Sequence, residues 1–232
     1  MSWADKLLLE IDAVDCEHAL FATVQESAQA LGFEYCAYGM LIPVPAMNPK
    51  TFMLNSYPAT WQQHYARNSY LDIDPTVHAG RRSSQPILWC DDLFVQAPEL
   101  WNDARDAGLR VGWAKSVLDG QGTGGLLTLA RNRGALTAEE LVENEFKMRW
   151  LACMAHQGFR KILWTRWSVA LTGREREVLR WAAYGKTFSE TSLIMDIAVA
   201  TVKFHTRNAA EKLGTINRTA AVAKAVALRL LD

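Results

Sequence analysis

The chain has 232 residues, which is long for one minimal domain and sufficient for two modest ones. Half of the residues are hydrophobic and 22% are charged, which excludes a disordered chain, and no apolar run approaches the roughly 18 residues of a membrane span. The net charge is zero, but from Ala170 onward ten Lys and Arg outnumber six Asp and Glu, so a basic C-terminal domain suited to phosphate contact follows an acidic one.

The first part of the chain mixes helical and strand patterns. Apolar spacing, prolines and a capping box predict helices at about 3–13, 16–31, 58–68 and 97–107, and a long one from Thr137 to about 163. Aromatic and apolar runs predict strands at 33–42, 51–56, 111–118 and 125–130, with a loop at 43–50 and a turn through DGQGTGG after Leu118. We therefore expect an α+β fold: an α-β-α sandwich over residues 1–163 with four or five antiparallel strands, then a linker at 164–170.

The basic tail, 171–232, reads as four short helices. Thr172 and Thr187 each begin a capping box, and Asn217 is placed to cap the last helix. The third helix, at about 199–213, has an inward stripe at helical spacing and an outward face that carries Lys203 and Arg207. The members of the stripe are Val202, His205, Ala209 and Leu213. Two basic residues alone would fit a solvated face equally well, but tight connections between short helices are typical of a helix-turn-helix.

The tail resembles the LuxR-type helix-turn-helix over nearly its whole length. The matching residues include Leu171-Thr172, Arg174-Glu175, Glu177-Val178-Leu179, Gly185-Lys186, Thr201-Val202-Lys203, His205, Asn208, Lys212-Leu213 and Asn217-Arg218. The resemblance implies that the third helix contacts double-stranded promoter DNA through Thr201, Lys203, Phe204 and Arg207. The chain departs from the family pattern at Ala198, where a Ser or Thr is usual at the start of this helix.

A second pattern lies in the segment YPATWQQHYARNSYLDIDP. Trp61 and Tyr65 are four residues apart on one predicted helix, so they share a face, and Asp74 follows before a proline. A carboxylate among aromatic side chains is costly unless a donor meets it, and a ligand amide N–H is such a donor. The alternative is that the aromatic residues are ordinary core and Asp74 is a turn or cap residue.

The spacing Trp61-x3-Tyr65-x8-Asp74-x14-Trp89 resembles the acyl-homoserine lactone receptors within the LuxR family, as do ARDAGLRVGWA and GLLTLARN. The resemblance implies that Trp61 donates to the lactone carbonyl, Asp74 accepts the ligand amide N–H and Tyr57 donates to the amide carbonyl. Tyr65, Trp89 and Trp101 would then form the pocket wall. Thr128 would bond the amide carbonyl or a 3-oxo group, and Thr76 and Met40 are weaker candidates.

The resemblance also implies a ligand-responsive transcriptional regulator in quorum sensing, acting as a homodimer with RNA polymerase as a further partner. The long helix from Thr137 and the last helix, with Val222, Val226 and Leu230, are candidate dimer surfaces or ordinary packing faces. The acidic N-terminus is no signal peptide, and we expect a cytoplasmic protein without membrane contact. We expect no metal or other cofactor, because Cys16, Cys36, Cys90 and Cys153 are too far apart in sequence for a CxxC site.

Three other functions fit parts of the pattern. The same fold can sense a small molecule that is not a lactone, and the first domain can instead be a protein-interaction module. An enzyme that hydrolyses lactones is the third, but the sequence has no G-x-S-x-G elbow and no HxxxH metal motif.

Overall fold

The computed structural model describes residues 2–41, 51–118, 124–167 and 169–231. The chain divides into two compact units, of which the first comprises Met1–Leu41, Thr51–Asp119 and Thr123–Arg166. The second unit holds the C-terminal segment Trp167–Asp232. The predicted loop 43–50 and most of the turn after Leu118 lie outside the described residues.

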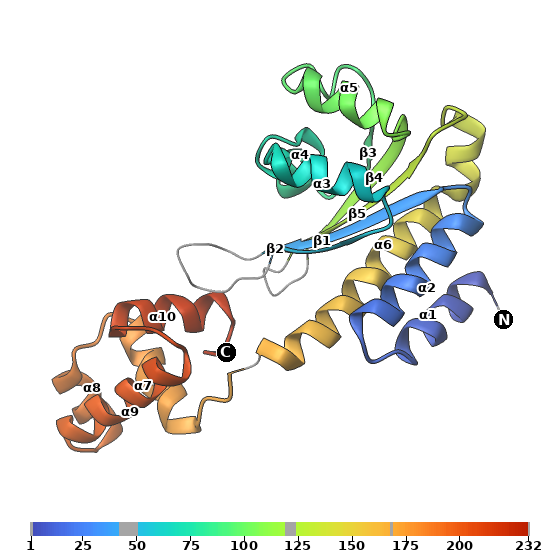
Figure 1. Ribbon diagram of the computed structural model, residues 1–232. Helices are drawn as coiled ribbons and strands as arrows, with labels where there is room; N and C mark the ends of the chain where they lie inside the picture. Colours follow the sequence, from blue (N-terminus) through green and yellow to red (C-terminus); the bar gives the residue numbers. More distant parts are fainter. Residues whose placement is uncertain (1, 42–50, 119–123, 168, 232) are drawn as a thin grey trace. The chain divides into compact units, whose positions relative to one another are not determined.

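The first unit contains one antiparallel sheet in the order β2-β1-β5-β4-β3 (Figure 1). The strands are β1 (Tyr35–Leu41), β2 (Thr51–Asn55), β3 (Ile87–Leu88), β4 (Val111–Leu118) and β5 (Gly124–Arg131). Sequence analysis predicts four of these strands, and β3 is the additional one. Because β3 has only two residues, it carries no alternation that a sequence pattern can reveal.

Helices cover both faces of the sheet, which confirms the predicted α-β-α sandwich (Figure 1). One face carries α1 (Trp3–Asp12), α2 (Glu17–Ala30) and α6 (Ala138–Trp167). The other carries α3 (Ala59–Arg67), the 3-10 helix η1 (Tyr70–Asp72), α4 (Pro75–Arg82) and α5 (Pro98–Asp106). Helix α6 continues to Trp167, so the first four residues of the predicted linker are helical.

The register of β1 decides which side chains face which helices. Tyr38 is fully buried and stacks on Phe159 of α6, with ring centroids 4.3 Å apart. Its hydroxyl lies 2.8 Å from Nδ1 of His156, also on α6. Because side chains alternate along a strand, Cys36 and Met40 face α6 with Tyr38, while the odd-numbered residues of β1 face α3, α4 and α5.

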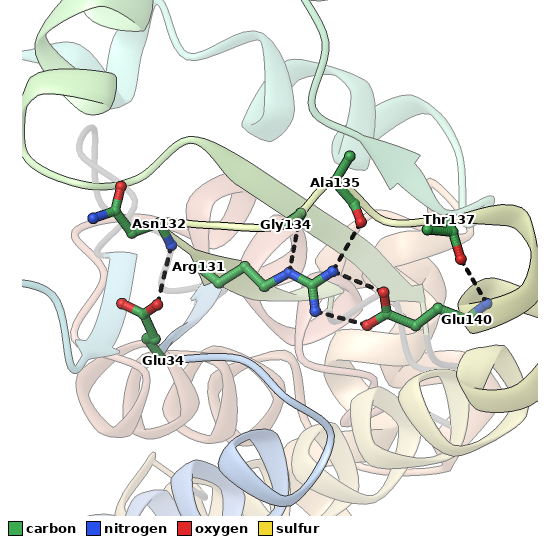
Figure 2. A network of polar contacts seen from close by, with 7 residues as sticks. All are labelled: Glu34, Arg131, Asn132, Gly134, Ala135, Thr137 and Glu140. Carbon is green, nitrogen blue, oxygen red and sulfur yellow. Dashed lines mark hydrogen bonds and ion pairs between the residues drawn. The ribbon is translucent and has the colours of Figure 1, made fainter.

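An arginine joins the end of β5 to the start of α6 (Figure 2). The two terminal nitrogens of Arg131 each donate to one carboxylate oxygen of Glu140 at 2.7 Å. Its Nε donates to the Gly134 carbonyl and one terminal nitrogen also donates to the Ala135 carbonyl. The hydrogen bond from Arg131 holds the pKa of Glu140 below its usual range. Such a bidentate charged pair fixes geometry, so it sets how β5 enters α6.

The second unit is the predicted set of four helices. They are α7 (Gly173–Ala183), α8 (Phe188–Met195), α9 (Val199–Lys212) and α10 (Arg218–Ala227). Both predicted capping boxes form, and Asn217 caps α10. The buried carboxylate of Glu175 accepts from Thr172 N and, at 2.7 Å, from Lys212 Nζ, which ties the start of α7 to the end of α9.

The inward face of α9 differs from the predicted stripe at one position. Val202, Ala209 and Leu213 are buried as expected, but Thr206 takes the place of His205, which remains partly exposed. The Thr206 hydroxyl donates to the Val202 carbonyl at 2.8 Å. A polar side chain can be buried where its hydroxyl is satisfied in this way, so a hydrophobicity pattern overlooks it.

Candidate functional site

An aromatic cluster lies between the sheet and the helices α3, η1, α4 and α5. Its buried members come from α3, η1, the segment before α5, and α5 itself, and they pack against the end of β5. They are Trp61, Tyr70, Phe94, Ala97, Leu100, Trp101, Ala104, Leu109 and Ala130, with Tyr35, Tyr57, Tyr65 and Trp89 partly buried beside them. The sequence-predicted aromatic residues therefore come together from the helices α3 and α5 and from the segments that hold Tyr57 and Trp89.

Helix α3 contributes two of the predicted aromatic residues. Trp61 is 5% exposed, and the Tyr65 ring meets it edge-on with centroids 5.7 Å apart, as the i, i+4 spacing predicts. Just before this helix, Tyr57 packs against Tyr35 of β1 with ring centroids 6.2 Å apart. Burial raises the pKa of the Tyr57 hydroxyl, so it is a hydrogen-bond donor rather than a phenolate.

Asp74 is the carboxylate within this cluster and also the N-cap of α4. One oxygen accepts from Thr76 N at 2.8 Å, and the other accepts from the Tyr65 hydroxyl at 2.9 Å. Burial raises the pKa of Asp74 in spite of the donors around it, from the Tyr65 side chain, the Thr76 backbone and side chain and the Val77 backbone, all of which act in the opposite direction. The carboxylate is therefore incompletely compensated, and each of its oxygens has capacity for a further donor.

Two buried polar atoms, one on Thr76 near Asp74 and one on the cluster residue Trp89, lack hydrogen-bond partners. Among the described residues, neither the Thr76 hydroxyl oxygen nor the Trp89 indole nitrogen has a hydrogen-bond partner. The Trp89 ring lies against Gly112 of β4, where an added Cβ would overlap its atoms. Buried polar groups are rarely left unpaired in proteins, so each of these atoms has capacity for a hydrogen bond to a polar group that reaches it.

Helix α5 closes the cluster on another side. The Trp101 ring stacks on Phe94 with centroids 4.5 Å apart and an interplanar angle of 3°. Its indole N–H donates to Asp91 at 2.6 Å, so Trp101 offers the cluster only an apolar surface. Sequence analysis did not single out Phe94 or Asp91, and no spacing signal connects either of them with Trp61.

The sheet positions the remaining candidates differently. Thr128 of β5 pairs with Ala37 of β1 and Ala114 of β4, on the same face as the cluster residue Ala130 two positions further along. Met40 has the same parity as Tyr38 and therefore lies on the opposite face, toward α6. The structure brings Thr128 to the aromatic face and does not bring Met40 there.

The candidate DNA-contacting residues share the outer face of α9. Lys203 and Arg207 are exposed, Phe204 is 50% exposed and Thr201 is partly exposed. The Arg207 guanidinium lies 3.8 Å from Glu211 in an open i, i+4 pair, a contact too weak to hold it away from DNA. Helix α9 has no side-chain hydrogen bond at its N-cap, Ala198.

Comparison with known proteins identifies both regions. A family model described as "Autoinducer binding domain" matches residues 17–159, and one described as "Bacterial regulatory proteins, luxR family" matches residues 169–225. The chain belongs to the LuxR family of quorum-sensing transcriptional regulators. This LuxR-type chain is 44% identical over 219 residues to the transcriptional activator protein SolR of Ralstonia solanacearum, which covers 93% of each chain.

Solved LuxR-type structures have the same fold. The crystal structure of Escherichia coli SdiA matches with a TM-score of 0.90 at 28% identity, covering 99% of this chain and 98% of that one. SdiA in complex with octanoyl-rac-glycerol gives a TM-score of 0.87 at 28% identity, covering 99% and 95%. CepR2 of Burkholderia cenocepacia, described as N-acylhomoserine lactone dependent, gives 0.62 at 27% identity, covering 69% of this chain and 96% of that one.

Family membership disfavours two of the three alternative functions, the enzyme and the protein-interaction module, and leaves the identity of the small molecule open. LuxR-type relatives are transcriptional regulators rather than enzymes, and the first domain is an autoinducer-binding domain, which implies a small-molecule ligand. No described helix is long and apolar enough to cross a membrane. Within the described part of the chain, no three His, Cys, Asp or Glu side chains are grouped so that they could hold a metal ion.

Proposed function

We propose that this LuxR-type regulator binds an N-acyl-homoserine lactone in the aromatic cluster and binds promoter DNA as a dimer through α9. The observation that supports the ligand is the partly compensated carboxylate of Asp74, whose pKa burial raises. An acyl-homoserine lactone has an amide N–H that can donate to this carboxylate, and an apolar ring and chain that suit aromatic walls. CepR2, which shares the fold of the first unit, is described as dependent on this ligand class.

The proposed contacts follow from the free polar groups. The amide N–H donates to Asp74, the Tyr57 hydroxyl donates to the amide carbonyl, and the Trp61 indole N–H donates to the lactone carbonyl. The unpartnered Trp89 indole N–H packs against the same cluster and is available to a further ligand oxygen, and the Thr76 hydroxyl, two residues from Asp74, is a second candidate. Thr128 reaches the ligand from the sheet, while Tyr65 and Trp101 serve as walls because Asp74 and Asp91 already hold their polar atoms. Met40 is left out of this set.

The DNA-binding part of the proposal rests on α9. Thr201, Lys203, Phe204 and Arg207 lie at exposed or partly exposed positions of one helix, which is the geometry that a major groove accepts. We assign Arg207 to a base edge and Lys203 to a phosphate or a base. RNA polymerase is the further partner that a transcriptional activator requires, and we place no residue at that contact.

Dimerisation is proposed through α6 and α10. On α6, Val142 and Phe146 are 86% and 66% exposed at i, i+4 spacing, and Phe146 stacks on Trp150 with ring centroids 6.3 Å apart. On α10, Val226 is 53% exposed. An apolar stripe on each unit suits a second copy of the chain, because helix-turn-helix proteins read two related half-sites with paired recognition helices.

The ligand proposal is tested by thermal unfolding of the purified chain with acyl-homoserine lactones of graded chain length. A ligand that binds only the folded state raises the melting temperature, and we expect the rise to be largest at one chain length. Asp74→Asn should reduce that rise strongly, because the asparagine side chain is neutral and accepts a hydrogen bond less strongly than a carboxylate does. Asp72→Asn is the matched control, since Asp72 is an exposed carboxylate two residues away and should leave the response unchanged.

A response by Asp74→Asn equal to that of the natural chain would remove Asp74 from the ligand site. A second ligand class enters the same series because SdiA has been solved with octanoyl-rac-glycerol. Such an acylglycerol has hydroxyl donors and no amide N–H. If octanoyl glycerol stabilises the chain and no lactone does, the proposed ligand becomes an acylglycerol, while the proposed ligand site stays the same.

A further inference from the structure

The segment Asp91–Asp106, here called the lid, is held together by its own side chains. Asp91 accepts from the Trp101 indole N–H at 2.6 Å and lies 3.4 Å from the Arg105 guanidinium. Phe94 stacks on Trp101 within the same segment. The lid therefore contains a turn and a helix, α5, that are fastened to each other by these contacts.

Both ends of the lid leave the sheet at the same edge. Before the lid, Trp89 N donates to the Gly112 carbonyl at 2.9 Å, and β3 pairs with β4 there. After the lid, Gly108 has a φ of +84°, a left-handed conformation that glycine adopts without strain. The lid thus begins and ends beside the same strand, β4, and α5 packs on the aromatic cluster.

One carboxylate joins the lid to the helices on the other side of the cluster. Asp103 of α5 accepts from the Tyr70 hydroxyl of η1 at 2.6 Å, and His64 Nε2 of α3 lies 2.6 Å from the same oxygen. Throughout residues 51–118, the side-chain hydrogen bonds that connect the lid to α3 and η1 all end on Asp103. The Tyr70 and His64 hydrogen bonds keep the pKa of Asp103 low, so its carboxylate is ionised and the His64 nitrogen donates.

This contact is at the rim of the cluster, directly above the proposed ligand contacts. The side chains of His64 and Asp103 are 47% and 36% exposed, whereas Trp61 and Trp101 beneath them are 5% and 6% exposed. The Tyr70 ring packs on Trp61 and Tyr65 with centroids 6.2 and 5.8 Å away. A ligand that is enclosed by Trp61 and Trp101 can enter or leave only if some part of this cover separates.

We propose that Asp103 is the latch of this lid: its hydrogen bonds to Tyr70 and His64 hold α5 closed over the ligand site and limit the rate of ligand exchange. The inference rests on the proposed ligand site, but closure of the lid is a property of the free protein as well. Opening breaks these two short hydrogen bonds to a charged group and also separates the buried lid residues Phe94, Leu100 and Trp101 from the rest of the cluster. Asp103 acts through Tyr70 and His64, and is a positioning residue that does not itself touch the ligand.

Amide hydrogen exchange of the ligand-free chain gives the first test. We expect Asp103→Asn and Tyr70→Phe to accelerate exchange in α5 by about threefold to tenfold, with the amides of β4 and β5 unchanged. Tyr70→Phe keeps the ring packing and removes only the hydroxyl. Faster exchange in this variant therefore reports the lost hydrogen bond and not a general loss of structure. Asp106→Asn is the matched control, because Asp106 is an exposed carboxylate on the same helix, and it should exchange like the natural chain.

Ligand kinetics give the second test, with the acyl-homoserine lactone that stabilises the natural chain most. We expect dissociation to accelerate by about tenfold in Asp103→Asn and Tyr70→Phe, and association to accelerate as well, so that Kd changes less than either rate. A faster dissociation with unchanged association would mark a lost ligand contact and overturn the latch. Natural rates in both variants would overturn it too, while the ligand site itself stands.

A natural chain that binds no lactone would instead contradict the proposed ligand. In that case hydrogen exchange decides alone: faster exchange confined to α5 supports a latched lid, and unchanged exchange in α5 overturns it. The failure of the ligand proposal and the failure of the latch are therefore distinguishable.

Discussion

Asp74 shows how one residue can serve the fold and a ligand together. Its carboxylate caps α4 through Thr76 N and accepts from Tyr65, so it is required in the folded chain before any ligand is present. Burial nevertheless raises its pKa, which means that the protein donors around it do not fully replace water. A third donor from a ligand would complete the compensation, and this links ligand binding to protonation.

The sign of that linkage gives a pH prediction. Because the folded pKa of Asp74 is raised, its protonated form is favoured in the ligand-free chain, and its contribution to stability declines as the pH rises through the raised pKa. A ligand N–H favours the ionised form, so lactone binding releases a proton and affinity falls as the pH falls through that pKa, above the ordinary aspartate value of about 3.9. Calorimetric titrations in buffers of different ionisation enthalpy will measure the released proton.

Asp74→Asn is the control for this experiment, because it has no titrating carboxyl at that position and should show no proton release from it. Uptake of a proton by the natural chain on binding would contradict the assigned role. Equal proton release by both chains would mean that a group other than Asp74 loses the proton.

At the element scale, α9 differs from its neighbours at its first turn. Helices α7, α8 and α10 each have a side-chain N-cap, whereas Ala198 at the N-cap of α9 has none to offer. Its backbone has φ −62° and ψ 144°, the extended conformation that capping residues adopt. A serine hydroxyl at this position could accept from the first-turn amides, of which Thr201 N at present donates to the Ala198 carbonyl at 2.9 Å.

We expect Ala198→Ser to raise the free energy of unfolding of the second unit by about 0.5–1 kcal/mol. Urea unfolding followed by amide exchange in α9 measures the gain. Ala200→Ser is the matched control, since Ala200 is exposed in the same first turn but lies inside the helix, where a serine cannot cap it. If the two variants are equally stable, the N-cap of α9 is already satisfied by another group.

Elements that sequence analysis overlooked have physical reasons for being overlooked. Helix α4, Pro75–Arg82, buries Thr76 and Gly80 rather than an apolar stripe, so its periodicity is invisible, although Asp74 before Pro75 is a usable start signal. Met40 was included as a weak ligand candidate because the parity of β1 is fixed only by its neighbours in the sheet. Asp103 and His64 are 39 residues apart, and no pattern connects them.

At the scale of the whole molecule, the charge division of the sequence corresponds to two compact units. The ligand cluster lies entirely in the first unit and α9 entirely in the second. The basic residues of the tail suit sequence-independent attraction to phosphates, which falls with salt, while the base contacts proposed for α9 would provide specificity. A ligand in one unit can therefore affect DNA binding in the other through the folded population or the dimer, without touching DNA.

The proposed dimer offers a test that separates these routes. We expect Phe146→Glu to dissociate the dimer, because it places a charge in the exposed apolar stripe of α6. Sedimentation velocity should then show a monomer at concentrations where the natural chain is a dimer, and affinity for a two-fold DNA site should fall by about tenfold or more as the paired contact is lost. A retained lactone-induced rise in melting temperature confirms that the first unit still folds.

Arg207→Ala is the paired variant, and it should weaken the same DNA site by a different route. Its sedimentation should match the natural dimer, while loss of a base contact costs about 1–3 kcal/mol and relaxes recognition at one position in each half-site. A dimeric Phe146→Glu would exclude the α6 stripe from the interface, and an unchanged footprint with Arg207→Ala would remove that residue from the contact set. If the first variant loses affinity through assembly and the second through recognition, the two units contribute separately to DNA binding, one by pairing the chains and the other by reading the site.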